Sequence, residues 1–439
     1  MSPVEIVIFG CVLLFILLAT SMPVAFAMAI VGIVGYAMIP TQSPQAALSM
    51  AGGVLRGKLV SHLLTVIPLF VLMGQVSFHS GISRRLFDAA YHWLGWLPGG
   101  LAMATVGACT GFGAICGSGP ATSATMAAVA LPEMKRFKYS MELGCGTVAA
   151  GGSLGMLIPP SVVLIAYGIM TEKSIGRLFI AGIVPGLLIA GLFCLTILVQ
   201  CLRRPHLGPV ATRSSWHDRF FSLLGVIETL ALFALVMGGM FRGLFTPTEA
   251  AAVGAAGSLV IALLRGKLSW PMLTQSLMET IRTSCMVLFI VIGALMFGKF
   301  LNVSQVPQQL AEWLKTLDLP GFMVMALIIL FYLVTGCFVD ALALMLLTVP
   351  IFQPVVSELG FDLVWFGVMI VVVTQMGVIS PPVGVCVYVV SGIERDVPLG
   401  TIFRGALPFL LALVVAAGLL IAFPDIVLWL PQFVVEAKH

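Results

Sequence analysis

The sequence predicts an all-α protein that crosses a membrane many times. Hydrophobic residues make up 60 % of its 439 residues and charged residues only 9 %, whereas a soluble domain carries about 25 % charged residues. So few polar groups could not cover the surface of a soluble protein of this size. Apolar runs of about 18 or more residues also recur along the chain. These observations exclude soluble, disordered and nucleic-acid-binding proteins, and we expect contact with membrane lipid.

About ten apolar segments have the length of a full crossing, which takes about 20 residues. They are residues 4–20, 22–39, 62–80, 140–170, 176–201, 219–241, 248–265, 274–299, 362–392 and 400–423.

Two further apolar stretches, residues 99–131 and 320–350, are too long for one crossing and too short for two with a loop. Small or polar residues interrupt both: Gly117, Ser118 and Gly119 in the first, and Gly336 through Asp340 in the second. Broken backbone at membrane depth is tolerated only where it lines a cavity or is buried in protein. We therefore predict two re-entrant helical hairpins.

The chain divides into similar halves on either side of a polar segment, residues 203–218. Three landmarks recur 222 to 224 residues apart: Pro23 with Pro247, residues 97–99 with 319–321, and the Pro-Pro pair 159–160 with 381–382. We predict a first repeat at residues 1–202, a cytoplasmic linker at 203–218 and a second repeat at 219–439. In each repeat a hairpin precedes a broken helix, at residues 140–170 and 362–392.

Charge indicates that the repeats are inverted. The base of the first hairpin is basic and that of the second is mostly acidic, and basic residues gather on the cytoplasmic side. The first base and the linker should then be cytoplasmic and the second base external. Inverted repeats with broken helices are typical of secondary transporters, whose binding site lies at the midplane. The basic residues at the base of the first hairpin are Arg84, Arg85, Lys135, Arg136 and Lys138, and the acidic residues at the base of the second are Glu312, Asp318, Glu358 and Asp362.

The Pro-Pro pairs and the hairpin tips are the candidate ion-binding elements. Proline removes a backbone N–H, and the freed carbonyls, together with half-helix dipoles, can ligate a dehydrated Na⁺. The first tip adds the hydroxyls of Ser118 and Thr122. Asp340 is either a functional carboxylate at membrane depth or the N-cap of the second hairpin arm. Thr374 and Gln375 are either site residues or interhelical hydrogen-bonding groups.

Other motifs indicate structure rather than chemistry. Thr246, Pro247 and Glu249 have the spacing of a helix capping box. Residues 52–59 match the spacing of a phosphate-binding loop, but Leu59 replaces the required Ser or Thr. We therefore expect no use of ATP. The histidines have no ligand spacing, so we expect no structural metal.

The motifs resemble those of the large membrane subunit of tripartite ATP-independent periplasmic (TRAP) transporters. The resembling stretches are residues 67–74, 81–86 and 97–102, GSGPAT at 117–122, MLIPPS at 156–161, PTEAAA at 247–252 and SPPVG at 380–384. The resemblance implies a Na⁺-driven symporter of the bacterial inner membrane, with a scaffold and a transport domain that moves as an elevator. It also implies a small membrane subunit, expected as a separate chain, and a periplasmic binding protein that delivers an organic anion.

The same resemblance implies the site residues. The anion would be a dicarboxylate, a sugar acid or a sialic acid, bound by Ser118, Gly119 and Asp340. Pro120 departs from the small residue usual at the first tip. The implied Na⁺ ligands are Gly117, Ser118, Thr122, Pro159 and Pro160 at the first site, and Gly336, Asp340, Thr374, Gly377, Pro381 and Pro382 at the second.

Three alternatives remain open at the level of sequence. A stand-alone Na⁺/dicarboxylate symporter of the ion-transporter superfamily, to which the resemblance also assigns this chain, would need no binding protein. A passive channel would need no sodium gradient. An intramembrane hydrolase would need a base within reach of a nucleophile such as Ser153, in the GxSxG pattern at residues 151–155, and the sequence offers no nearby partner.

Overall fold

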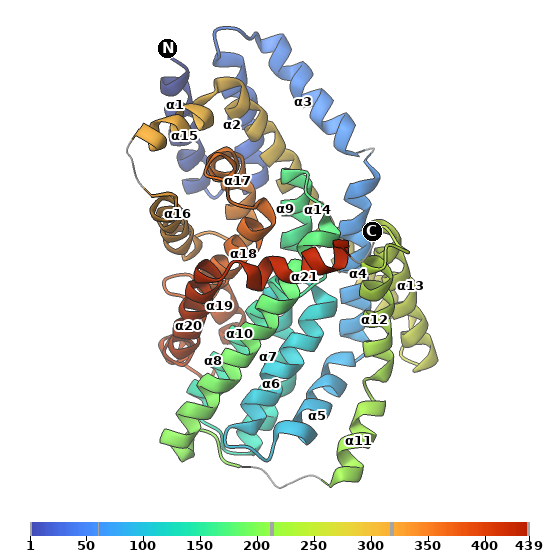
Figure 1. Ribbon diagram of the computed structural model, residues 1–439. Helices are drawn as coiled ribbons and strands as arrows, with labels where there is room; N and C mark the ends of the chain where they lie inside the picture. The colour runs from blue at the N-terminus through green and yellow to red at the C-terminus, as the bar shows by residue number, and fades with distance from the viewer. Residues whose placement is uncertain (1, 60, 211–214, 317–319, 437–439) are drawn as a thin grey trace.

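The protein is an all-α membrane protein (Figure 1). The computed structural model describes residues 2–59, 61–210, 215–316 and 320–436. These residues form 21 α-helices and three short 3₁₀ segments, and no strand occurs among them. The predicted residues Asp318 and Leu319 lie outside the described residues.

The helices of the first half precede the polar segment. They are α1 (Pro3–Ala19), α2 (Val24–Met38), α3 (Pro44–Leu59), α4 (Val66–His79), α5 (Ile82–Leu94), α6 (Gly100–Cys116), α7 (Gly119–Arg136), α8 (Met141–Ser153), α9 (Val162–Thr171) and α10 (Ile175–Arg203).

The second half begins with two short helices. Its helices are α11 (Trp216–Leu224), α12 (Ile227–Phe241), α13 (Pro247–Leu264), α14 (Trp270–Ser304), α15 (Val306–Thr316), α16 (Gly321–Gly336), α17 (Ala341–Glu358), α18 (Leu363–Ile379), α19 (Val385–Ile393), α20 (Leu399–Ala422) and α21 (Asp425–Glu436).

Local sequence accounts for where several helices begin. At the start of α13, the Glu249 amide donates to Thr246 Oγ1 at 3.3 Å and the Thr246 amide donates to Glu249 Oε2 at 2.8 Å. These two bonds form the capping box, and Pro247 occupies the first helical turn, where its missing N–H costs nothing. Ser2 and Glu5 form the same arrangement at α1.

The spans differ in length more than the sequence pattern predicts. Five helices, α10, α13, α14, α17 and α20, are long and apolar enough to cross a membrane, and bent pairs raise the number to seven among the described residues. Several shorter apolar helices, including α6, α9, α16 and α18, have only 10–17 residues. These short helices flank the breaks, because a broken span is divided into two pieces.

The helices form two packed groups. In one, α14 packs along α2 and α4, and α13 packs on α4 and α12. The other contains α6 to α10 and α16 to α20, in which α8 packs on α6, α7 and α20, and α18 packs on α16 and α20. The groups meet mainly where α4 contacts α6 and where α14 contacts α17.

The halves interlock inside the second group. Helix α7 packs against α19, and α17 packs against α9. Each helix pair, α6–α7 or α16–α17, therefore contacts the broken helix of the opposite half.

Two prolines at the predicted ends of the hairpins, near residues 131 and 350, lie inside helices. Pro132 lies within α7, which continues to Arg136, and Pro350 lies within α17, which continues to Glu358. An interior proline removes one backbone hydrogen bond, and membrane helices tolerate this where neighbouring groups compensate.

Residues 207–209 of the polar segment are docked on the protein. The Gly99 amide donates to Gly208 O at 3.1 Å and the Ser140 amide donates to Leu207 O at 3.0 Å. Tyr139 donates to Pro209 O at 2.9 Å, and burial raises the pKa of Tyr139 to about 12, so the phenol keeps this proton at neutral pH. The segment thereby fixes the base of the first helix pair.

Candidate functional site

The first break joins the tip of the α6–α7 pair to the segment between α8 and α9. Gly117 ends α6 with φ +66°, a conformation that favours glycine. Its carbonyl accepts the Val162 amide at 3.3 Å, and a Cβ at Gly117 would lie 2.5 Å from Pro160 O. Thr122 Oγ1 donates to Ser118 O at 2.7 Å. The structure thus brings four of the five residues expected at the first site together, and Pro159 precedes Pro160 in the same segment.

Gly155 belongs to this first break, although sequence analysis does not select it. A Cβ at Gly155 would lie 2.7 Å from Thr122 Oγ1 and 2.9 Å from Ser118 O. Gly155 lies 222 residues before Gly377. Subtracting the repeat spacing of 222 from the number of each second-site residue would have identified Gly155 from the sequence.

The second break has the same construction. A Cβ at Gly377 would lie 2.3 Å from Gly336 O, and one at Gly336 would lie 3.9 Å from the Thr374 Cα. The Val383 amide donates to Cys337 O at 3.3 Å, as the Val162 amide does to Gly117 O in the first half. Gly336, Thr374 and Gly377 therefore lie together.

Asp340 caps the second arm of its helix pair. Its Oδ2 accepts the Leu342 amide at 3.0 Å and the Ala343 amide at 3.4 Å. Of the two roles that the sequence allows for Asp340, these bonds are those of a helix N-cap. Two backbone donors satisfy one of its carboxylate oxygens. Thr374 donates to Val371 O at 2.9 Å.

The two breaks differ in exposure. Pro159 and Pro160 are buried, whereas Pro381 and Pro382 are exposed. Both Pro-Pro bonds are cis. The second break is therefore accessible from the surface of this chain and the first is enclosed.

A buried hydrogen bond connects the two broken helices. Gln375 Nε2 donates to Ser153 O at 3.1 Å, and these residues lie 222 positions apart in the chain. Both side chains are fully buried. The Gln375 Oε1 and the hydroxyls of Ser123 and Thr147 are buried with no hydrogen-bond partner among the described residues. Gln375, which the sequence leaves undecided, thus bonds equivalent positions of the two halves to each other.

Ser153 lies in an environment that does not suit a nucleophile. Its hydroxyl donates to Ala150 O at 2.7 Å, within its own helix, and the residue is fully buried.

In the described part of the chain, no three His, Cys, Asp or Glu side chains form a cluster suited to binding a metal ion.

The predicted substrate residues have different surroundings. Ser118 lines a cavity of about 60 Å³ between the first tip and the other helix group, with Gln75 of α4 and Thr283 of α14. Gly119 instead packs on Met156, whose Cγ would lie 3.0 Å from an added Cβ. Asp340 lies at the start of α17 in the opposite half. Gln75 and Thr283 are polar residues that sequence analysis did not select.

Residues 11–426 match the family described as "Tripartite ATP-independent periplasmic transporter, DctM component". The chain is 37 % identical over 373 residues to the C4-dicarboxylate TRAP transporter large permease protein DctM of Pseudomonas aeruginosa, covering 85 % of this chain and 87 % of that protein. It is 34 % identical over 425 residues to the sialic acid TRAP transporter large permease protein SiaM of Vibrio cholerae, covering 95 % and 96 %.

A solved structure also shares the fold. The YdaH transporter of Alcanivorax borkumensis superposes with a TM-score of 0.66 at 17 % identity, covering 91 % of this chain and 96 % of that chain. At this identity the likeness supports the fold alone.

Proposed function

Because this chain belongs to the DctM component family of tripartite ATP-independent periplasmic transporters, we propose that it carries an organic anion across the bacterial inner membrane, coupled to a sodium gradient. Its relatives are named for C4-dicarboxylate and for sialic acid, and a sugar acid is a third substrate class. The observation that carries the proposal is the pair of equivalent breaks, each packed against the tip of a helix pair.

Each break binds a sodium ion in this proposal. Carbonyl groups left free by the prolines, together with half-helix dipoles, replace the water around the ion. The Thr122 hydroxyl and the Asp340 carboxylate supply further oxygens. The ligands are drawn from Gly117, Ser118, Thr122, Pro159 and Pro160 at the first site, and from Gly336, Asp340, Thr374, Gly377, Pro381 and Pro382 at the second.

The anion binds at the tips. The amides at the start of α7, beginning at Gly119, present the positive end of a helix dipole, which favours a carboxylate. The Ser118 hydroxyl lines the adjoining cavity and adds a hydrogen bond. Neutralisation of Asp340 by the second sodium ion lets an anion approach that end of the site.

Transport follows an elevator mechanism with re-entrant hairpins. The α6–α7 and α16–α17 pairs and the broken helices α8–α9 and α18–α19 move together against the group formed by α2, α4, α13 and α14. This division follows the two groups of packed helices, which meet mainly where α4 contacts α6 and α14 contacts α17. A small membrane subunit holds the stationary group, and a periplasmic binding protein delivers the anion.

The decisive experiment is uptake of labelled succinate, N-acetylneuraminate and D-gluconate into proteoliposomes that contain this chain with its small subunit. Each anion is tested with and without an inward Na⁺ gradient, and with and without the cognate binding protein. We expect uptake that needs both. Uptake that ignores the gradient contradicts sodium coupling, and uptake without the binding protein favours the stand-alone symporter.

A further inference from the structure

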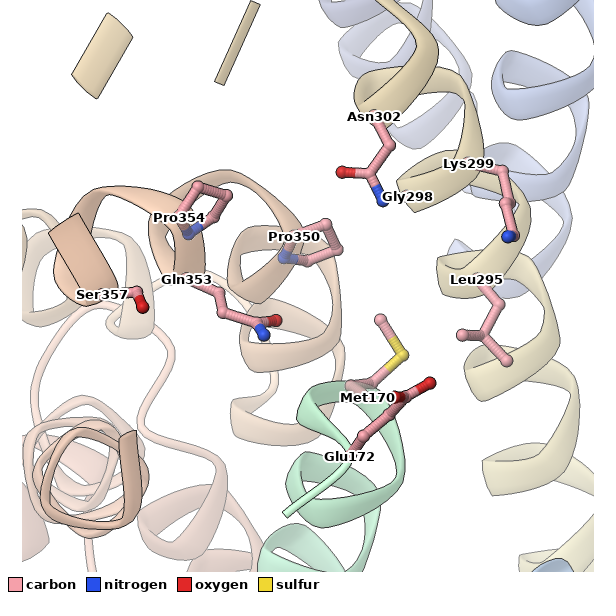
Figure 2. A pocket seen from close by; sticks show the side chains of 10 residues that line it. All are labelled: Met170, Glu172, Leu295, Gly298, Lys299, Asn302, Pro350, Gln353, Pro354 and Ser357. Atoms are coloured by element: carbon pink, nitrogen blue, oxygen red, sulfur yellow. The ribbon is translucent and has the colours of Figure 1, made fainter. Parts of the chain in front are cut away.

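A polar cavity between the two helix groups lies away from both breaks. It has a volume of about 350 Å³ and lies between α14, α17 and the end of α9 (Figure 2). On α17 the lining begins at Pro350, ten positions beyond Asp340, which is about 15 Å along a helix. The cavity is therefore separate from the site at the tips.

Both long helices present one regular stripe to this cavity. On α14 the lining residues are 295, 298, 299 and 302, and on α17 they are 350, 353, 354 and 357. Each set follows the i, i+3, i+4, i+7 spacing of a single helix face. The helices approach closely where Gly298 meets Pro350, because a Cβ at Gly298 would lie 3.4 Å from the Pro350 Cβ.

Beside this close approach, the polar lining combines one cation, one anion and three neutral groups. Figure 2 shows the Asn302 and Gln353 amides reaching into the space between α14 and α17, with Glu172 at the end of α9. Ser357 adds a hydroxyl. Lys299 also lines a neighbouring cavity of about 630 Å³, whose other charged residue is Lys58. Lys58 does not line the 350 Å³ cavity, so Lys299 is the one cation of its lining that can pair with a carboxylate.

This set of groups distinguishes between classes of organic anion. A dicarboxylate needs two cationic partners, and its second carboxylate would be repelled by Glu172. A sugar acid carries one carboxylate for Lys299 and several hydroxyls. Amides both donate and accept hydrogen bonds, and a carboxylate accepts them from hydroxyls, so Asn302, Gln353 and Glu172 suit a polyol chain.

We propose that this cavity binds a monoanionic, hydroxyl-rich carboxylate of the sugar-acid class as a second station for the transported anion. The proposal rests on the proposed function, since the station serves the same substrate. Lys299 binds the carboxylate, and Asn302, Gln353, Ser357 and Glu172 bind hydroxyls.

The test is equilibrium binding of labelled D-gluconate and of succinate to the purified chain with its small subunit in nanodiscs. Wild type should bind gluconate in preference to succinate. We expect Lys299→Gln to weaken gluconate binding by about tenfold, the loss of one charge-assisted bond, and Lys299→Arg to retain it. Gly298→Leu, whose added side chain would meet Pro350 at the wall of the cavity, should abolish this binding.

The matched controls lie elsewhere. Lys267→Gln changes an exposed lysine outside both cavities, and Gly418→Leu adds a side chain where an added Cβ has nothing within 4 Å. Both should bind gluconate like wild type. The variant Ser357→Cys tests where gluconate binds. The reaction of its new thiol with a charged thiol reagent should be slower in the presence of gluconate and unchanged in the presence of succinate.

The outcomes separate this inference from the proposed function. If sodium-driven uptake of any of the three anions persists but gluconate binding is absent, or is unchanged in Lys299→Gln and Gly298→Leu, the second station is overturned and the proposed function stands. If no anion is taken up while gluconate binding depends on Lys299, the proposed function fails instead. A phospholipid that co-purifies with wild type and is lost in Lys299→Gln identifies the cavity as a lipid headgroup site and overturns the inference.

Discussion

Single glycines decide how closely the broken helices approach the tips. At Gly377 a Cβ would lie 2.3 Å from Gly336 O, which is backbone and cannot move aside without displacing the tip. Overpacking of this kind costs about 1–3 kcal/mol. We expect Gly377→Ala to lower the melting temperature by several degrees and to abolish sodium-dependent uptake.

Gly392→Ala, in the next helix, is the matched control. An added Cβ there has nothing within 4 Å, so stability and uptake should equal those of wild type. Wild-type uptake by Gly377→Ala would contradict the close packing of the second break.

Two substitutions of Asp340 can distinguish its role as a helix cap from its proposed role in binding sodium. Loss of its two amide bonds in Asp340→Ala should cost about 0.5–2 kcal/mol of stability, read from the melting temperature. Asp340→Ser restores a capping oxygen but not the charge. We expect Asp340→Ser to regain stability and to transport with much weaker dependence on Na⁺. Full sodium-dependent uptake by this variant would reduce the role of Asp340 to capping.

At the scale of elements, one ion pair joins α7 to α19 across the two halves. Lys135 Nζ lies 2.7 Å from Glu394 Oε1 and 3.6 Å from Asp396 Oδ2. The hydrogen bond to Glu394 raises the pKa of Lys135, so Lys135 is charged at neutral pH and loses its charge only when the pH rises through this raised pKa, above the usual lysine range.

We expect Lys135→Glu to slow uptake at neutral pH several-fold, because three carboxylates then face one another between α7 and α19. The double variant Lys135→Glu with Glu394→Lys should recover part of the rate, measured as initial uptake in proteoliposomes. No recovery in the double variant would indicate that the pair does not couple these helices.

The sequence predicts the elements of the site better than their ends and their contacts. Paired prolines and small residues interrupt apolar runs, so the breaks and the tips can be recognised without a structure. The predicted hairpin ends at Pro132 and Pro350 are wrong, because a proline removes one backbone hydrogen bond but does not by itself end a helix. The docking of residues 207–209, the bond from Gln375 to Ser153 and the polar cavity at Lys299 depend on contacts between distant segments, which spacing along the chain does not encode.

At the scale of the whole molecule, the proposed elevator mechanism requires α17 to move against α14. The position of a Cβ on Gly298 lies 3.4 Å from the Pro350 Cβ, close to the separation of about 3.5–4.5 Å that a disulfide needs. We expect the double variant Gly298→Cys with Pro350→Cys to cross-link under oxidation and to stop uptake, with reductant restoring it.

Each single variant, oxidised in the same way, is the control for the native cysteines. Continued uptake by the fully cross-linked protein would contradict relative motion of the two helix groups at this contact.

The bond from Gln375 to Ser153 has a consequence for how the protein is made. A ribosome releases the chain from its N-terminus, so Ser153 enters the membrane long before the residue that bonds to its carbonyl has been synthesised. During that interval α9 lacks α17 and α7 lacks α19. The first half therefore remains incompletely packed in the bilayer. The group formed by α6 to α10 and α16 to α20 can assemble only when nearly the whole chain has been inserted.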